Sequence, residues 1–146
     1  MSDRFSSFPG TRFLTRPTPQ GFGIRFRVRD DKSVYTTVVF DASKEGGPGL
    51  LHGGAIATVL DEAMGVAAYE ANSAGYTVTL TCNYRRKIPL GDEITIRARV
   101  DAIEGRRVYA SCEACLANGD IAVDATGIFA ISLNLQRLLE SRASKD

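Results

Sequence analysis

One stretch of the chain decides how the rest is interpreted, and it reads Leu51-His52-Gly53-Gly54-Ala55-Ile56-Ala57-Thr58-Val59-Leu60-Asp61-Glu62-Ala63-Met64-Gly65. It begins with the only histidine of the sequence and continues as an apolar helical pattern to about residue 72. Two carboxylates, Asp61 and Glu62, lie in the middle of this pattern. Burying a carboxylate costs several kcal/mol unless the group is paired. The helix therefore either uses these two carboxylates for a function or carries them at a cost in stability.

Residues three or four apart share a face of a helix, so the stretch divides into stripes. One stripe is small and polar, and comprises Gly54, Thr58, Asp61 and Gly65. A second is apolar and predicts core, and comprises Ile56, Leu60, Ala63 and Ala67. Glu62 falls on a third, with Ala55, Val59, Val66 and Tyr69. Because the first stripe has no bulky side chain, we expect a ligand or a second backbone to approach it closely.

The segments around the helix predict an α+β fold of one domain, residues 1–146. Alternating or β-branched patterns predict six strands, at 23–29, 34–40, 77–86, 94–102, 107–117 and 120–132. In the strand 77–86, simple alternation places Thr77 on the face opposite Leu80, Cys82 and Tyr84. Residues 1–20 predict a loosely held arm, and 133–146 a short helix with a frayed tail. A helix that is apolar nearly all round must be wrapped, and a curved antiparallel sheet satisfies this.

Composition excludes several classes of function. The chain has 146 residues and a net charge of +1, so no basic field indicates nucleic acid. The absence of a long apolar run or a signal sequence favours a cytoplasmic protein that does not enter membranes. Three cysteines, Cys82, Cys112 and Cys115, are interpreted as small core or interface residues, and with one histidine no metal site is expected.

The start of the helix predicts a site for negative charge. Its first amides have no acceptor within the helix, and the glycines at 53 and 54 leave them uncovered. Such amides suit the oxygen that becomes negative during acyl transfer. Asp61 lies ~10 Å further along the axis from Gly54 at 1.5 Å per residue. Asp61 would therefore act through a water or meet the amides of a second subunit.

These residues resemble the hotdog-fold acyl-CoA thioesterases, in particular their PaaI-like and Them-type branch. The resemblance rests on His52-Gly53-Gly54-Ala55-Ile56-Ala57-Thr58, with Asp61 nine residues after the histidine, and on the segment Tyr84-Arg85-Arg86-Lys87-Ile88-Pro89-Leu90-Gly91-Asp92. It implies a six-stranded sheet around one long helix. It also implies dimers that often pair into tetramers, with acyl-CoA as the substrate and no cofactor beyond the coenzyme A that the substrate carries.

The resemblance also implies roles for single residues. Asp61 takes the place of the catalytic carboxylate, as general base or nucleophile, and Gly53 or Gly54 supplies the oxyanion amide. His52 shapes the loop or contacts the thioester, and the Thr77 hydroxyl helps to hold the attacking water. The chain departs from the family pattern in having glycine at 46, where some members carry asparagine, and at 65, where another branch carries a hydroxyl residue.

Further residues are candidates for substrate binding. Clustered cations at Arg85, Arg86 and Lys87 suit the phosphates of coenzyme A, although a solvated strand end would look the same. Glu62 is expected to pair with an arginine or to line the mouth of the site, and Gly65 to leave room for the substrate. Two other functions stay open: a non-catalytic acyl-CoA binding protein, and a hydratase or dehydratase, which would need an Asp–His pair.

Overall fold

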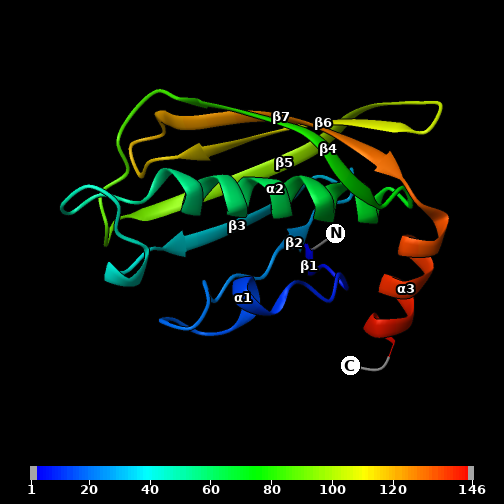
Figure 1. The fold of residues 1–146 in the computed structure, drawn as a ribbon, viewed down its shortest axis with the longest axis horizontal. Helices are drawn as coiled ribbons and strands as arrows, with labels where there is room; N and C mark the ends of the chain where they lie inside the picture. The colour runs from blue at the N-terminus through cyan, green and yellow to red at the C-terminus, as the bar shows by residue number, and fades with distance from the viewer. Residues whose placement is uncertain (1–2, 145–146) are drawn as a thin grey trace.

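A computed structural model describes residues 3–144. Its central feature is α2, an 18-residue helix spanning Gly53–Glu70, which runs along a seven-stranded sheet (Figure 1). The elements follow in the order β1 (Arg4–Phe5), α1 (Arg12–Thr15), β2 (Arg27–Val28), β3 (Val34–Val39), the 3-10 helix η1 (Ala42–Lys44), α2, β4 (Gly75–Tyr84), β5 (Glu93–Glu104), β6 (Arg107–Cys115), β7 (Ile121–Ile131) and α3 (Leu133–Ala143). The predicted helix and the strands β3 to β7 agree with these bounds to within two residues.

The sheet is antiparallel throughout, with strand order β1-β2-β3-β5-β6-β7-β4. β3 and β4 are separated in sequence only by η1 and α2, yet three strands lie between them in the sheet, so α2 carries the chain across its face. β4 pairs only with β7 and therefore forms one edge. The predicted α+β hotdog architecture is confirmed, with one more strand than expected because the N-terminal arm contributes β1.

The core lies between α2 and the sheet. The predicted apolar stripe of Ile56, Leu60, Ala63 and Ala67 is at most 2% exposed. Buried side chains from the sheet face it, among them Ile94, Ile96, Val108, Ala110 and Phe129. The small stripe points away from this core, and a Cβ added at Gly65 would meet no atom within 4 Å. The division of α2 into a packed and an open face is therefore confirmed.

Both ends of α2 are set by local chemistry. His52 precedes the helix in extended conformation and caps it, and Asn72, just beyond the C-cap Ala71, has a positive φ of 58°. Asparagine tolerates this left-handed conformation better than most residues. Within residues 3–144, no helix is long and apolar enough to span a membrane.

The N-terminal arm is more ordered than the sequence predicts. Arg4 and Ser6 both bond the carboxylate of Glu70, a residue on α2 that is only 9% exposed. The predicted strand 23–29 shortens to β2, because the amide of Ile24 donates to the carbonyl of Leu14 in α1 rather than to a neighbouring strand. Burial still alternates along this segment, with Ile24, Phe26 and Val28 inside. The arm lies alongside α2 on the side away from β4 (Figure 1).

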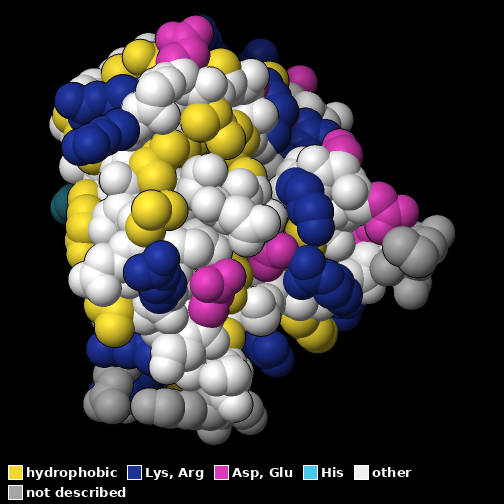
Figure 2. Space-filling model, turned by 90° about the vertical axis from the view of Figure 1, so that its right-hand side faces the viewer, with side chains coloured by type: hydrophobic (Ala, Val, Ile, Leu, Met, Phe, Trp, Pro, Cys, Tyr) yellow, Lys and Arg dark blue, Asp and Glu magenta, His cyan; other side chains and the backbone are white. Residues whose placement is uncertain are grey.

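The C-terminal helix α3 closes one end of the molecule. Buried Gln136 accepts the amide of Ala74 and donates to the carbonyl of Tyr69, which ties α3 to the end of α2. Leu133 and Leu138 remain exposed on its surface. Seen from this end, basic and acidic side chains are intermixed around a group of hydrophobic ones (Figure 2). This face carries no field of a single sign. Residues 145 and 146 of the predicted tail lie outside the described residues.

The cysteines are small packing residues, as predicted. Cys112 and Cys115 are buried and Cys82 is half-buried, and all three are free thiols. Cys112 Sγ lies 3.8 Å from the carbonyl oxygen of Leu60 on α2, whereas Cys115 Sγ accepts a bond from Arg97. The two thiols therefore have different surroundings and form no joint site.

Candidate active site

Asp61 and Thr77 form the centre of the candidate site. Asp61 lies half-buried on the open stripe of α2, and the hydroxyl of Thr77 on β4 donates to its Oδ1 at 2.8 Å. Simple alternation placed Thr77 on the wrong face of its strand. A β-bulge between Thr77 and Thr79 shifts the register, so Thr77 faces α2 together with Tyr84 further along. The structure thus brings together two residues that the sequence pairs only through the family resemblance.

The side chain of His52 accepts a hydrogen bond from the Gly54 amide, one of the two amides predicted as oxyanion donors. Its Nδ1 accepts the N–H of Gly54 at 2.8 Å, which caps α2 and places the proton of a neutral imidazole on Nε2. The next two amides donate to the carbonyl of His52. Within residues 3–144, the N–H of Gly53 donates to no recorded acceptor. Of the two predicted glycines, Gly53 is therefore the one whose amide can meet a substrate in this conformation.

Tyr84 supports the start of α2, a role that the sequence analysis did not assign to it. Its hydroxyl donates to the carbonyl of Gly53 at 2.8 Å, and its ring lies where a Cβ on Gly53 would make ordinary van der Waals contact. Burial, followed by the neighbouring Cys82, raises the pKa of Tyr84, so its hydroxyl remains a donor at neutral pH. The alternation Leu80, Cys82, Tyr84 is the sequence signal for the orientation of Tyr84 toward α2.

The predicted cationic cluster lies at the mouth of this region. Arg85, Arg86 and Lys87 line a cavity of about 370 Å³ together with Gly53 and Tyr84. The three cations therefore lie beside the start of α2, and their contact with coenzyme A phosphates stays a prediction. The charges of two of these residues are partly neutralised, because Arg85 forms an ion pair with Asp124, and Arg86 forms one with Asp120 at 3.5 Å.

Glu62 lies on a different side of α2 from Asp61. Its carboxylate accepts the backbone N–H of Thr11 at 3.1 Å and the Thr11 hydroxyl at 3.3 Å, rather than pairing with an arginine as one prediction had it. It lines a second cavity, beneath the N-terminal arm. Desolvation raises the pKa of Glu62, and the two bonds from Thr11 oppose that effect.

The raised pKa of Glu62 predicts how the free energy of unfolding should depend on pH. A carboxyl whose pKa is raised on folding favours the folded state at low pH, and that contribution is lost as pH rises through the folded pKa. Glu62→Gln keeps an acceptor for Thr11 but does not ionise. We expect the variant to be stabilised relative to wild type more at pH 7 than at pH 4, by roughly 2–4 °C in Tm for each kcal/mol gained. Thermal unfolding at both pH values measures this, and an equal difference at both would contradict it.

The arrangement limits the chemistry that these groups can perform. His52 caps the helix while Asp61 accepts Thr77, so the Asp–His pair of a hydratase is not formed. Across the described part of the chain, no three His, Cys, Asp or Glu side chains gather as a metal site would require. What the geometry offers is a carboxylate, a hydroxyl and a helix-terminal amide, which are the groups that acyl transfer to water requires.

Comparison with known proteins supports this interpretation of the fold and of the sequence motif that begins at His52. The family model described as the thioesterase superfamily matches residues 48–123, about half of the chain. Acyl-coenzyme A thioesterase THEM4 of Bos taurus is 32% identical over 122 residues, which cover 81% of this chain and 50% of that protein. The chain spans no more than about half the length of the curated relatives it matches first.

Solved structures give the same result. A crystal structure of a thioesterase superfamily protein superposes with a TM-score of 0.74 at 30% identity, covering 76% of this chain and 57% of that one. The PaaI protein of E. coli, from the phenylacetic acid degradation operon, superposes with a TM-score of 0.70 at 20% identity, covering 76% and 80%. The hotdog resemblance is thereby confirmed in sequence and in fold, and the chain belongs to the thioesterase superfamily.

Proposed function

We propose that this protein hydrolyses the thioester of an acyl-CoA to a free acid and coenzyme A. The observation that carries the proposal is the hydrogen-bonded pair of Asp61 and Thr77 on the open stripe of α2, next to a sheet edge. A carboxylate fixed by a hydroxyl donor is oriented for work on a substrate. Gly65 on that stripe faces open space, which leaves room for a thioester beside Asp61.

The reaction follows from these groups. Asp61 takes a proton from a water molecule, and the resulting hydroxide attacks the thioester carbonyl carbon. Alternatively, Asp61 attacks the carbon itself, and water then cleaves the mixed anhydride. In both routes the carbonyl oxygen becomes negative and accepts the N–H of Gly53, and the C–S bond breaks to release the coenzyme A thiolate, which takes up a proton. Thr77 holds the carboxylate, and its oxygen can accept a bond from the water.

The separation of these groups favours a site shared by two subunits. Gly53 and Asp61 are eight positions apart on one helix, about 12 Å at 1.5 Å per residue, so one carbonyl cannot meet both within a chain. β4 has an unpaired edge and exposes Tyr76 and Val78. Pairing two β4 edges about a two-fold axis would set the two helices antiparallel, with Gly53 of one near Asp61 of the other. A homodimer is therefore part of the proposal, and a homotetramer remains a prediction.

The cations at the mouth support coenzyme A as the leaving group. Arg85, Arg86 and Lys87 lie beside the helix start, where phosphates would also meet its positive end. A hypothetical thioesterase of Streptococcus pneumoniae, 22% identical with a TM-score of 0.68 and covering 72% of this chain and 84% of that one, has been solved with coenzyme A. Two other structures of that protein carry alanine in place of an aspartate and of a threonine, one replacement in each. The two replaced residues are 16 positions apart in the sequence, as Asp61 and Thr77 are here.

The release of free thiol tests the proposal. The purified protein is mixed with acetyl-, butyryl-, octanoyl-, decanoyl-, palmitoyl- and phenylacetyl-CoA, and thiol is followed with a chromogenic disulfide. Thiol release that scales with protein concentration for at least one substrate is expected. Binding of acyl-CoA without thiol release would instead identify a non-catalytic binding protein, and water addition to an enoyl-CoA without release would identify a hydratase.

Removing the Thr77 hydroxyl should weaken catalysis without stopping it. In Thr77→Val, Asp61 loses a hydrogen bond to a charged group, worth about 1.5–3 kcal/mol. We expect kcat to fall by roughly 10- to 100-fold. Thr37→Val makes the same change at an exposed position of β3 and is the matched control. Equal kcat values for the two variants would show that the contact to Asp61 does not serve the reaction.

A further inference from the structure

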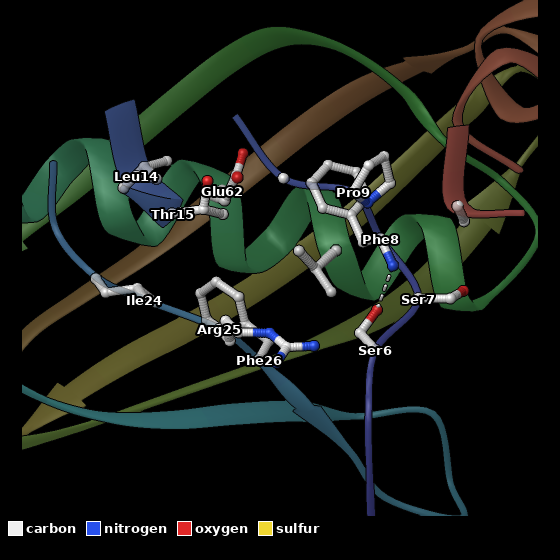
Figure 3. A pocket seen from close by; sticks show the side chains of 13 residues that line it. Ser6, Ser7, Phe8, Pro9, Leu14, Thr15, Ile24, Arg25, Phe26 and Glu62 are labelled. Carbon is white, nitrogen blue, oxygen red and sulfur yellow. Dashed lines mark hydrogen bonds between the residues drawn. The ribbon is translucent and has the colours of Figure 1, made fainter. Parts of the chain in front are cut away.

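A second cavity lies between the N-terminal arm, which precedes the residues that the family model matches, and α2. It has a volume of about 450 Å³. Its apolar lining includes Phe8, Leu14, Ile24, Phe26 and Val66. Figure 3 shows Phe8 and Pro9 on one side of it, Ile24 and Phe26 on another, and Thr15 beside Glu62 at one end.

The arm is fastened to α2 on both sides of this cavity. Near one end, Ser6 bonds Glu70, and the hydroxyls of Ser7 and Tyr69 lie 3.0 Å apart. Near the other end, Thr11 bonds Glu62. The ring of Phe8 packs edge-on against Tyr69 at 5.4 Å. The cavity is therefore a built feature between two anchored points of the arm, and it does not depend on a loose loop.

The cavity and the candidate active site are neighbours on α2. Glu62 and Val66 form a wall of the cavity, and Asp61 lies on the adjacent stripe. At 100° per residue, Gly65 lies between Asp61 and Glu62 on the outward face of the helix. A Cβ at Gly65 would meet no atom within 4 Å. The surface of α2 at Gly65, between the carboxylate of Asp61 and the apolar cavity, is therefore open.

We propose that the acyl chain of the substrate crosses α2 at Gly65 and occupies the cavity beneath the N-terminal arm. This inference rests on the proposed thioesterase function and gives the substrate class. At ~30 Å³ for a water-sized group, the volume holds about fifteen such groups, which fits straight acyl chains of about eight to twelve carbons. The apolar part of the lining favours a longer saturated chain over a short acyl group, because each buried methylene adds up to about fourfold in affinity, whereas Thr15, Arg25 and Glu62 make other parts of the lining polar.

Narrowing and widening the cavity test the proposal in opposite directions. Thr15→Trp places an indole in the cavity, and Phe8→Leu removes part of a wall. The readout is the ratio of kcat/KM for each of octanoyl-, decanoyl- and palmitoyl-CoA to that for acetyl-CoA. We expect Thr15→Trp to lower the decanoyl ratio at least tenfold, and Phe8→Leu to raise the palmitoyl ratio relative to wild type. Thr37→Trp, at the exposed position of β3, is the matched control and should leave every ratio unchanged.

A binding measurement separates failure of this inference from failure of the proposed function. Calorimetry compares decanoyl-CoA with coenzyme A on wild type, Thr15→Trp and Phe8→Leu. If wild type binds decanoyl-CoA at least tenfold more tightly than coenzyme A, and Thr15→Trp abolishes this gap, the cavity binds acyl chains even if no thiol is released. If thiol is released but chain-length ratios and the binding gap are the same in wild type and both cavity variants, the thioesterase stands and the acyl cavity is refuted. If Thr15→Trp does not fold, the Phe8→Leu ratio alone decides.

Discussion

Asp61→Asn is expected to lower kcat for acyl-CoA hydrolysis by about 10²- to 10⁴-fold, the usual contribution of a positioned general base. The amide has nearly the same shape and can still accept the bond from Thr77, but it neither takes a proton from water at neutral pH nor attacks a carbonyl. The loss should therefore appear in kcat, with little change in Tm or in affinity for coenzyme A.

The control for this variant is Asp101→Asn, which changes an exposed carboxylate on β5 that pairs with Arg99. It removes the same charge from the protein at an exposed position that is not part of the candidate site. Turnover near the wild-type level is expected for Asp101→Asn. Wild-type turnover in Asp61→Asn as well would remove Asp61 from the mechanism.

Gly53→Pro is expected to lower kcat by about 10²- to 10³-fold, as the loss of one oxyanion donor does in other enzymes. Gly53 is the first residue of α2, and proline is well tolerated at that position because its N–H has no partner within the helix. His52 before it has φ −66° and ψ 133°, which suits a residue that precedes proline. The substitution thus removes one N–H and leaves the helix in place.

Gly53→Ala is the matched control, because it adds a side chain but keeps the N–H. Its Cβ would lie 3.6 Å from the Tyr84 ring, an ordinary contact. We expect Gly53→Ala to lose far less activity than Gly53→Pro. Circular dichroism shows whether both variants keep the helix, and equal losses in the two would indicate that bulk at residue 53, rather than the amide, matters.

Much of the fold could be predicted from the sequence because its patterns are strong. The strict alternation at 94–102 and the β-branched run at 34–40 predicted β5 and β3, and the apolar stripe of Ile56, Leu60, Ala63 and Ala67 predicted the core face of α2. The order of the N-terminal arm could not be predicted in this way. It depends on long-range bonds from Arg4 and Ser6 to Glu70, and composition rich in proline and serine carries no sign of them.

The candidate site could be predicted only in part. Spacing along one helix placed Asp61 on an open stripe, but the orientation of Thr77 depends on a β-bulge that alternation does not reveal. The choice between Gly53 and Gly54 depends on the ring of His52, which takes the Gly54 amide. The first fact depends on how β4 pairs with β7, and the second on the orientation of the His52 side chain. The helical periodicity therefore identified Asp61 as a candidate, but only the structure shows which groups form hydrogen bonds around it.

We propose that Asp61 of one subunit and Gly53 of another act on the same thioester, and a mixture of two inactive variants tests this most directly. Asp61→Asn and Gly53→Pro chains are co-expressed with different tags and allowed to assemble. If the site is shared, each mixed dimer contains one site with both defects and one intact site, so a random mixture should recover about a quarter of wild-type thiol release. Recovery that tracks the fraction of mixed dimers is the predicted result. Activity no higher than that of either variant alone, with mixed dimers present, would contradict the account.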